Sequence, residues 1–229
     1  GSDPETPEWE WPDPEPEPDP EPVAGKPRFI WVDAAANFPD FANSRENIAR
    51  DLAKARDAGF TDIVVDVRPT TGDALFRTSA VEQVEWLGAW LPEGYSKIER
   101  TATWDYLQAF IDEGAKLGLR IHAAINTFTG GNLTSLGGAG VVFRDADKRA
   151  WTTDLNLANG ITNIMSTDQA AEFFNPVLPE VQEYICSMLR DLAAYDGLTG
   201  IFLDRGRCDG FTSDFSYYTR REFDKYRGV

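Results

Sequence analysis

Residues 62–69 read DIVVDVRP, a short apolar run that carries an acid and a base near its carboxyl end and stops at a proline. β-Branched residues bounded by a helix breaker are typical of a strand that is buried on both faces of a parallel sheet. A helix is predicted before this strand, because Ser44 can cap it and Gly59 can end it. Ile48 and Leu52 lie on one face of that helix. With a strand at Phe29–Ala34, this helix makes one β/α unit, and residues 63–68 repeat the strand pattern.

The alternation of strand and helix recurs along the chain. Further strands are predicted at Phe29–Ala34 (FIWVDA), Arg120–Thr127 (RIHAAINT) and Gly200–Asp204 (GIFLD), and further helices at Trp104–Leu117, from Pro179 onward and at Ser216–Arg227. In the last helix, Phe223 and Tyr226 are expected to face the core. Segments 69–103 and 128–178 are predicted to be long loops, which are often functional. Strands that alternate with helices imply a parallel sheet with right-handed crossovers.

The predicted fold class is α/β, and two architectures fit it. Four β/α units can form an open sheet, whereas a closed (β/α)8 barrel needs eight strands and about 250 residues. We expect a partial TIM-type barrel of about the first four β/α units, because all four strands end in polar residues followed by loops. The expected organisation is a disordered acidic, proline-rich linker at residues 1–26 and the N-terminal half of a truncated barrel at residues 27–229.

Acidic residues and prolines alternate through the expected linker, as in PEPEPDP at 14–20. Proline fixes the backbone and like charges repel, so this segment should be an extended spacer without a core. Residues 1–25 hold nine acidic and no basic residues, which leaves −7 of the net charge of −16 for the rest of the chain. The composition is similar to that of linkers that follow the lipid-anchored cysteine of bacterial surface lipoproteins.

Composition also limits the partners of the chain. A mildly acidic domain repels phosphate backbones, so no nucleic acid is expected to bind, whereas a neutral glycan meets no such barrier. No apolar run approaches the roughly 20 residues of a membrane-spanning helix, so a membrane would be reached only through an upstream lipid anchor. His122 is the only histidine, and Cys186 and Cys208 are the only cysteines. We therefore expect no metal site and no cofactor, and we expect unpaired cysteines, with Cys186 buried.

Polar residues at the ends of the predicted strands form the candidate site. They are Asp33 on the first strand, Asp66 and Arg68 on the second, Asn126 on the third, and Asp204 with the following Arg207 and Asp209 on the fourth. Asp66 and Arg68 are two residues apart, so they can either form a buried ion pair or contact substrate directly. Asp33 and Asn126 can either position a substrate or close local hydrogen bonds.

Asp204 is the sharpest candidate for catalysis. It ends an apolar strand, which would place its carboxylate at the rim, where burial and the nearby Arg205 or Arg207 tune its ionisation. The alternative is that Asp204 simply pairs with one of these arginines. Large aromatic residues can stack on sugar rings or pack in a core. The candidates for stacking are Trp86, Trp90 and Trp151, which are expected in the long loops.

Five stretches carry a resemblance to a known family. They are RFIWVDAAANF from Arg28, DIVVDVRPTTGDALF from Asp62, WDYLQAFIDEGAKLGLRIHAAINTF from Trp104, FNPVLPEVQEYI from Phe174 and GIFLDRGRCDGFTSDFS from Gly200. In this order they resemble the signature blocks of bacterial family-10-like glycosyl hydrolases over roughly Pro27 to Val229. The resemblance implies a TIM-type barrel, hydrolysis of glycosidic bonds and export from the cell. It also implies functional weight for Asp66, Arg68, Asn126, Asp204, Arg207 and Asp214.

The predicted function is hydrolysis of glycosidic bonds in a polysaccharide or oligosaccharide, which normally needs two carboxyl groups flanking the bond. Asp204 is expected to be the nucleophile or the acid/base. The chain departs from the family by stopping after the fourth unit, so the second carboxylate is expected beyond Val229 and this piece alone is expected to be inactive. The alternative function is a non-catalytic, glycan-binding surface protein. The expected location is the periplasm or cell surface, with an outer-membrane lipoprotein as one form; the sequence leaves the oligomeric state open.

Overall fold

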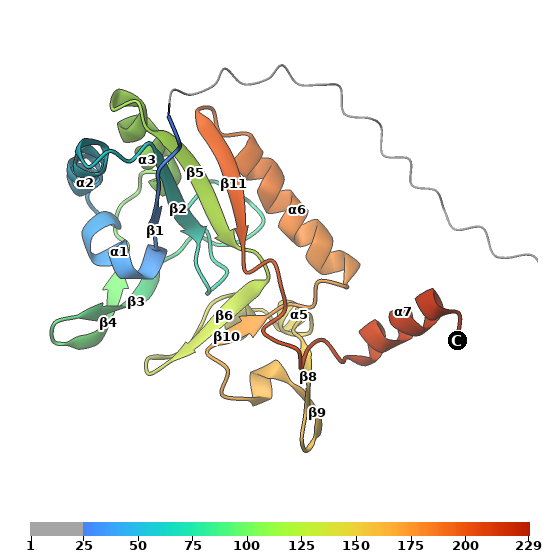
Figure 1. Ribbon diagram of the computed structural model, residues 1–229. Coiled ribbons are helices and arrows are strands. Elements are labelled where there is room, and N and C mark those ends of the chain that lie inside the picture. Colours follow the sequence, from blue (N-terminus) through green and yellow to red (C-terminus); the bar gives the residue numbers. More distant parts are fainter. Residues whose placement is uncertain (1–24) are drawn as a thin grey trace, which may run out of the picture.

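The computed structural model describes residues 25–229 and places four parallel strands in one sheet, in the order β1-β2-β5-β11 (Figure 1). The strands are β1 (Phe29–Val32), β2 (Asp62–Arg68), β5 (Arg120–Asn126) and β11 (Leu198–Asp204). The sequence therefore predicted each strand to within two residues at either end, and it predicted their parallel order. Of the expected linker, residues 1–24 lie outside the described residues.

Helices connect the strands and begin where the sequence supplies a cap. They are α1 (Ala34–Phe41), α2 (Arg45–Asp57), α3 (Tyr106–Lys116), α6 (Pro179–Ala193) and α7 (Tyr217–Arg227). Ser44 caps α2 by accepting the Asn47 N–H at 3.1 Å, as expected. Pro179 opens α6, where a proline costs no hydrogen bond. The predicted helices are thus present, whereas α1 was not predicted.

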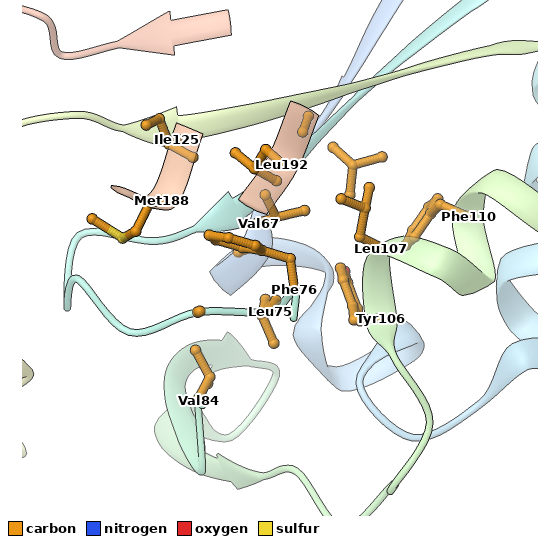
Figure 2. Close-up of a cluster of buried hydrophobic side chains, with 14 of the residues drawn as sticks. Val67, Leu75, Phe76, Val84, Tyr106, Leu107, Phe110, Ile125, Met188 and Leu192 are labelled. Atoms are coloured by element: carbon orange, nitrogen blue, oxygen red, sulfur yellow. The ribbon is translucent and has the colours of Figure 1, made fainter. Parts of the chain in front are cut away.

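One face of the sheet and helices α2, α3 and α6 enclose the main hydrophobic core (Figure 2). Val67 of β2 and Ile125 of β5 point toward the helices. The cluster drawn in Figure 2 also includes Leu75, Phe76, Val84, Tyr106, Leu107, Phe110, Met188 and Leu192. All of these side chains are at most 3% exposed, so this side of the sheet is fully packed.

The opposite face of the sheet is curved and open. In a flat sheet the edge strands β1 and β11 would lie three strand spacings apart, or about 14 Å. The rings of Phe29 on β1 and Phe202 on β11 nevertheless approach to 6.0 Å, and Trp31 lies 5.7 Å from the same Phe202 ring. Phe29 is 47% exposed and Trp31 is 44% exposed. Within residues 25–229, nothing covers this concave aromatic face.

The two segments predicted as long loops are largely ordered. The segment after β2 contains the hairpin β3 (Trp86–Leu91) and β4 (Gly94–Glu99). The segment after β5 contains β6 (Thr129–Thr134), β7 (Gly137–Ala139), α4 (Val141–Arg144), α5 (Ala146–Arg149), β8 (Asp154–Leu157), β9 (Gly160–Asn163), the 3-10 turn η1 (Ile164–Ser166) and β10 (Ala171–Phe173). Both insertions lie beyond the carboxyl ends of the sheet strands (Figure 1).

Two expectations about side-chain burial were wrong. Phe223 is 56% exposed and Tyr226 is 88% exposed, because α7 extends away from the sheet and has no buried residue (Figure 1). Cys186 is exposed on α6, although both cysteines are unpaired as expected.

Within residues 25–229, no helix combines the length and the apolar character needed to cross a bilayer.

Candidate functional site

The parallel register brings four of the predicted site residues to one rim. Val32 of β1 pairs with Val65 of β2, so Asp33 follows beside Asp66. Toward the other edge of the sheet, Asn126 of β5 pairs with Asp204 of β11. The side-chain amide of Asn126 contacts the Asp66 carboxylate at 3.3 Å. The carboxyl ends of all four strands therefore contribute to one polar group.

Asp66 is the most deeply buried acid of this group, at 6% exposure. Its carboxylate accepts the backbone N–H of Arg68 at 3.2 Å. Burial raises its pKa to about 7, and the negative charges of Asp33 and Asp204 add to the rise. Near neutral pH this side chain can therefore hold or release a proton, whereas an exposed aspartate stays ionised.

Asp33 and Asp204 flank this buried acid in different settings. Asp33 caps α1 by accepting the N–H of Ala36 at 2.8 Å, so the predicted local hydrogen-bonding role is present. Asp204 is exposed, and its Oδ1 accepts the backbone N–H of Arg205 at 2.8 Å. No ion pair within residues 25–229 joins Asp204 to Arg205 or Arg207. The Asp204 carboxylate is thus free to face a ligand at the rim.

Arg68 forms no ion pair with Asp66, although such a pair was one of its two predicted roles. Between these two residues the register shifts: Asp66 lies opposite Ala124, and Arg68 lies opposite the next residue, Ile125. The extra residue in β2 is a bulge, which turns Arg68 away from the Asp66 face. Its guanidinium donates to the backbone carbonyl of Asn126 and lies 5.9 Å from the Tyr184 ring of α6. Arg68 is 0% exposed, so it supports the strand end and is not available for a direct contact with substrate.

Arg207 and Asp209 lie in the loop after β11, apart from the buried acid. The guanidinium of Arg207 donates to the carbonyl of Cys208 at 2.9 Å and lies 5.7 Å from the ring of Phe173. Asp209 accepts the hydroxyl of Ser213. Arg207 thus packs against β10, and the bond between Asp209 and Ser213 lies within the loop. The predicted roles of Arg207 and Asp209 in substrate binding stay predictions.

Asp214 is the centre of a hydrogen-bond network that ties this loop to the insertion after β5. Its carboxylate accepts the backbone N–H of Asp154 at 2.7 Å, the amide of Asn175 at 2.9 Å, and the hydroxyls of Ser216 at 2.5 Å and Thr219 at 2.6 Å. A carboxylate with this many donors is structurally engaged. The resemblance gave Asp214 functional weight, and the geometry gives it a role in loop organisation.

The three candidate stacking residues occupy different surroundings. Trp86 and Trp90 lie on strand β3 of a hairpin, where a loop was expected. Trp90 is 79% exposed and packs beside Tyr95, with the ring centres 5.3 Å apart. Trp151 is part of the core packing, with its ring 5.6 Å from that of Tyr184. Trp86 is half-buried and lines a groove, so it is the best placed of the three for stacking.

The sequence did not point to Glu172, which lies on β10 and is 1% exposed. Its Oε2 is buried and has no hydrogen-bond partner within residues 25–229, and burial raises its pKa to about 7. Residues 171–174 (AEFF) show only the pattern of a short strand, so the sequence gives no indication of a buried acid.

Among the described residues, no three His, Cys, Asp or Glu side chains are arranged to hold a metal ion.

Comparison with known sequences gives one curated relative at a modest level of identity. No family model matches the chain. An S-layer-related protein of Niallia circulans is 29% identical over 206 residues, which cover 90% of this chain and 13% of that protein. The chain thus spans about one eighth of the length of the curated relative that it matches.

Comparison with solved structures shows a glycosidase-like fold. α-L-Fucosidase isoenzyme 2 from Paenibacillus thiaminolyticus superposes with a TM-score of 0.58 at 16% identity, over 88% of this chain and 26% of that chain. Isomaltulose synthase from Klebsiella sp. LX3 superposes with a TM-score of 0.50 at 12% identity, over 86% of this chain and 38% of that chain. A hypothetical protein from Ruminiclostridium thermocellum superposes with a TM-score of 0.50 at 11% identity, over 87% of this chain and 90% of that chain. These likenesses concern the fold, and they do not single out the family-10-like group.

Proposed function

We propose that this chain forms part of the (β/α)8 barrel of a family-10-like glycoside hydrolase that cleaves a polysaccharide or oligosaccharide. One observation carries the proposal: Asp33, Asp66, Asn126 and Asp204 meet at the carboxyl ends of four adjacent parallel strands. Barrel enzymes place their catalytic groups at this face, supplied by several strands. The likeness to the fucosidase fold supports the same assignment.

The open side of the sheet supports a barrel over a flat doubly wound sheet. Contact between aromatic rings of β1 and β11 requires strong curvature, as on the inside of a barrel. Within residues 25–229, both edge strands lack a neighbour on their outer side. Exposed edges of this kind pair readily with further strands. In the proposed arrangement, further β/α units pair with these edges, cover the aromatic face and pack against α7.

The proposed chemistry uses a pair of carboxyl groups across the glycosidic bond. Asp204 is the exposed carboxylate at the rim and acts as nucleophile or acid/base. Its partner is a carboxylate on a further strand of the complete barrel. Asp66 lies two strands away from Asp204 at the same rim, and burial raises the pKa of Asp66 to about 7. Asn126 and Asp33 would orient sugar hydroxyls at the same rim.

A second candidate function is glycan binding without catalysis at a cell surface. The observation that favours it is the similarity to a protein named S-layer-related. The same barrel and its aromatic residues would then hold a surface glycan, and residues 1–26 would act as a spacer. A surface or exported location fits both functions, and a carboxylate on a later strand end distinguishes the enzyme from the binder.

The test is to assay the complete gene product and residues 1–229 side by side on peptidoglycan, plant and host glycans, each with its Asp204→Asn variant. We expect turnover by the complete protein only, with a loss of at least a thousandfold in Asp204→Asn. Equal turnover by the two complete proteins would remove Asp204 from the chemistry. Hydrolysis by residues 1–229 alone would place the second carboxylate within this chain, and binding without any turnover would favour the surface binder.

A further inference from the structure

A groove lies between the two insertions that follow the adjacent strands β2 and β5. It has a volume of about 300 Å³, within the range of small-ligand sites. One wall comes from residues 71–86 and the other from residues 138–144. Because both walls leave the carboxyl ends of sheet strands, the groove belongs to the same end of the molecule as the acidic rim. None of the residues proposed for the rim lines it.

The walls of the groove are fixed to each other by polar contacts. The backbone N–H of Val141 donates to the carbonyl of Thr71 at 3.1 Å. Arg144 reaches across to Asp73 with bonds of 2.6 and 3.2 Å, and Asp73 is only 8% exposed. Two charge-assisted hydrogen bonds to one buried acid hold both walls in a fixed geometry. The shape of the groove is therefore set by contacts between its two walls.

The lining of the groove combines an aromatic wall with surplus negative charge. The half-buried ring of Trp86 borders it, and Lys97 lies 5.1 Å from that ring on the hairpin. Among residues 25–229, three acidic residues line the cavity, Asp73, Glu82 and Glu85, and one basic residue, Arg144. Arg144 pairs with Asp73 and with Glu82, and no ion pair within residues 25–229 engages Glu85. One exposed carboxylate beside an aromatic ring is thus left for a ligand.

We propose that this groove is a second glycan subsite, distinct from the rim, that binds an amino sugar unit of an oligosaccharide. The inference rests on the proposed function, because it assumes a glycan ligand. The ring of Trp86 would stack on the apolar face of the sugar, and Glu85 would pair with its ammonium group. Neutral sugars would bind through stacking alone. A uronic acid would be repelled by the unbalanced carboxylates.

The test is calorimetric titration of residues 1–229 with oligomers of glucosamine, glucose and galacturonic acid. The expected order of affinity is glucosamine, then glucose, with galacturonic acid not binding. Trp86→Ala should weaken binding of both the glucosamine and the glucose oligomers at least tenfold. Glu85→Gln, at an exposed position, should weaken glucosamine binding alone and remove the preference over glucose. Tyr226→Ala is the matched aromatic control, since Tyr226 is 88% exposed on α7, and should change nothing.

Each result decides between the subsite and its alternatives. Glucosamine binding that survives both Trp86→Ala and Glu85→Gln would reflect general attraction to an acidic protein and would overturn the proposal, as would any other order of affinities. Trp86→Ala and Glu85→Gln report on the groove, whereas Asp204→Asn reports on hydrolysis by the complete protein. Failure of the subsite and failure of the proposed function can therefore be told apart.

Discussion

The side-chain amide of Asn126 contacts both carboxylate oxygens of Asp66, at 3.4 Å to Oδ1 and 3.3 Å to Oδ2, and donates to the carbonyl of Arg68 at 3.0 Å. One amide thus links the ends of β5 and β2 at the rim. The contacts to the carboxylate are long, and they leave a buried acid whose charge is poorly compensated. The stability of the rim should therefore depend on the protonation of Asp66.

We predict that the free energy of unfolding falls as the pH rises from about 4 to above 7. The pKa of Asp66 is raised to about 7, and an unfolded aspartate titrates near 4, so the folded state binds more protons in this interval. The contribution of Asp66 is fully present below the unfolded pKa and is lost as the pH rises through the folded pKa. Its size is on the order of 4 kcal/mol, because one pKa unit corresponds to about 1.4 kcal/mol. Glu172 adds to the same trend, because burial raises its pKa to about 7.

Urea unfolding of residues 1–229 at several values of pH measures this dependence. Asp66→Asn keeps the shape of the side chain and removes the titration, so it should flatten the slope between pH 4 and pH 7. Glu172→Gln should flatten it further in the double variant. Asp196→Asn, at an exposed position, is the control and should keep the full slope. Parallel curves for Asp66→Asn and the unmodified chain would refute the buried-acid assignment.

A glycine pair tests how tightly the groove wall is built. Gly140 has a φ of 108°, and a Cβ at this position would overlap the carbonyl oxygen of Thr71. Gly137 has a φ of 95°, but a Cβ there would meet open space. Gly140→Ala should destabilise the fold by more than about 3 kcal/mol, whereas Gly137→Ala should cost only about 1 kcal/mol of backbone strain. Thermal unfolding compares them, and equal losses would contradict the close contact with Thr71.

Removing the Asp214 carboxylate should loosen the loop after β11. In Asp214→Ala, the donors of Asn175 and Thr219 and the backbone N–H of Asp154 lose a shared acceptor, which should cost roughly 2 kcal/mol. Hydrogen exchange of the Asp154 amide should become at least tenfold faster, while amides of β2 stay protected. Unchanged exchange at Asp154 would show that the network does not hold the loop.

Tyr195 links the end of α6 to the segment after β2. Its hydroxyl donates to Asp105 at 2.6 Å and accepts the backbone N–H of Arg77 at 2.5 Å. Tyr195→Phe should lower the free energy of unfolding by about 1–2 kcal/mol, because the carboxylate and the N–H both lose a partner. Tyr226→Phe removes an exposed hydroxyl and is the matched control in chemical unfolding. If Tyr195→Phe leaves the free energy of unfolding unchanged, water replaces both hydrogen bonds.

The strands and helices of the sheet could be predicted because local signals agree there. The run that ends at Arg68 is apolar and bounded by Pro69, and Ser44 caps the preceding helix as the sequence suggests. Because parallel strands end at the same edge of a sheet, Asp66 and Asp204 could be predicted to lie at one end. The register shift between Asp66 and Arg68 could not be predicted from these local signals.

Other features depended on contacts between distant segments. The burial of Glu172 follows from the packing of β10, and the groove beside Trp86 exists because residues 138–144 fold back onto residues 71–86. Short strands in a glycine-rich insertion carry little periodicity, so the sequence suggested a loop. The outward position of α7 could not be predicted either, since the apolar side chains of a helix indicate a buried face without saying what covers it.

The bulge in β2 gives Asp66 and Arg68 separate structural roles, although they are only two residues apart in the sequence. Without it, a change at residue 66 would alter the partner of residue 68, and the acid and the base would have to vary together. With it, Asp66 belongs to the rim and Arg68 to the scaffold beside Tyr184. Evolution could therefore have retuned the acid while the arginine went on anchoring the strand. A homologue that lacks one residue at this point would be expected to have lost both charges or to have joined them as a salt bridge.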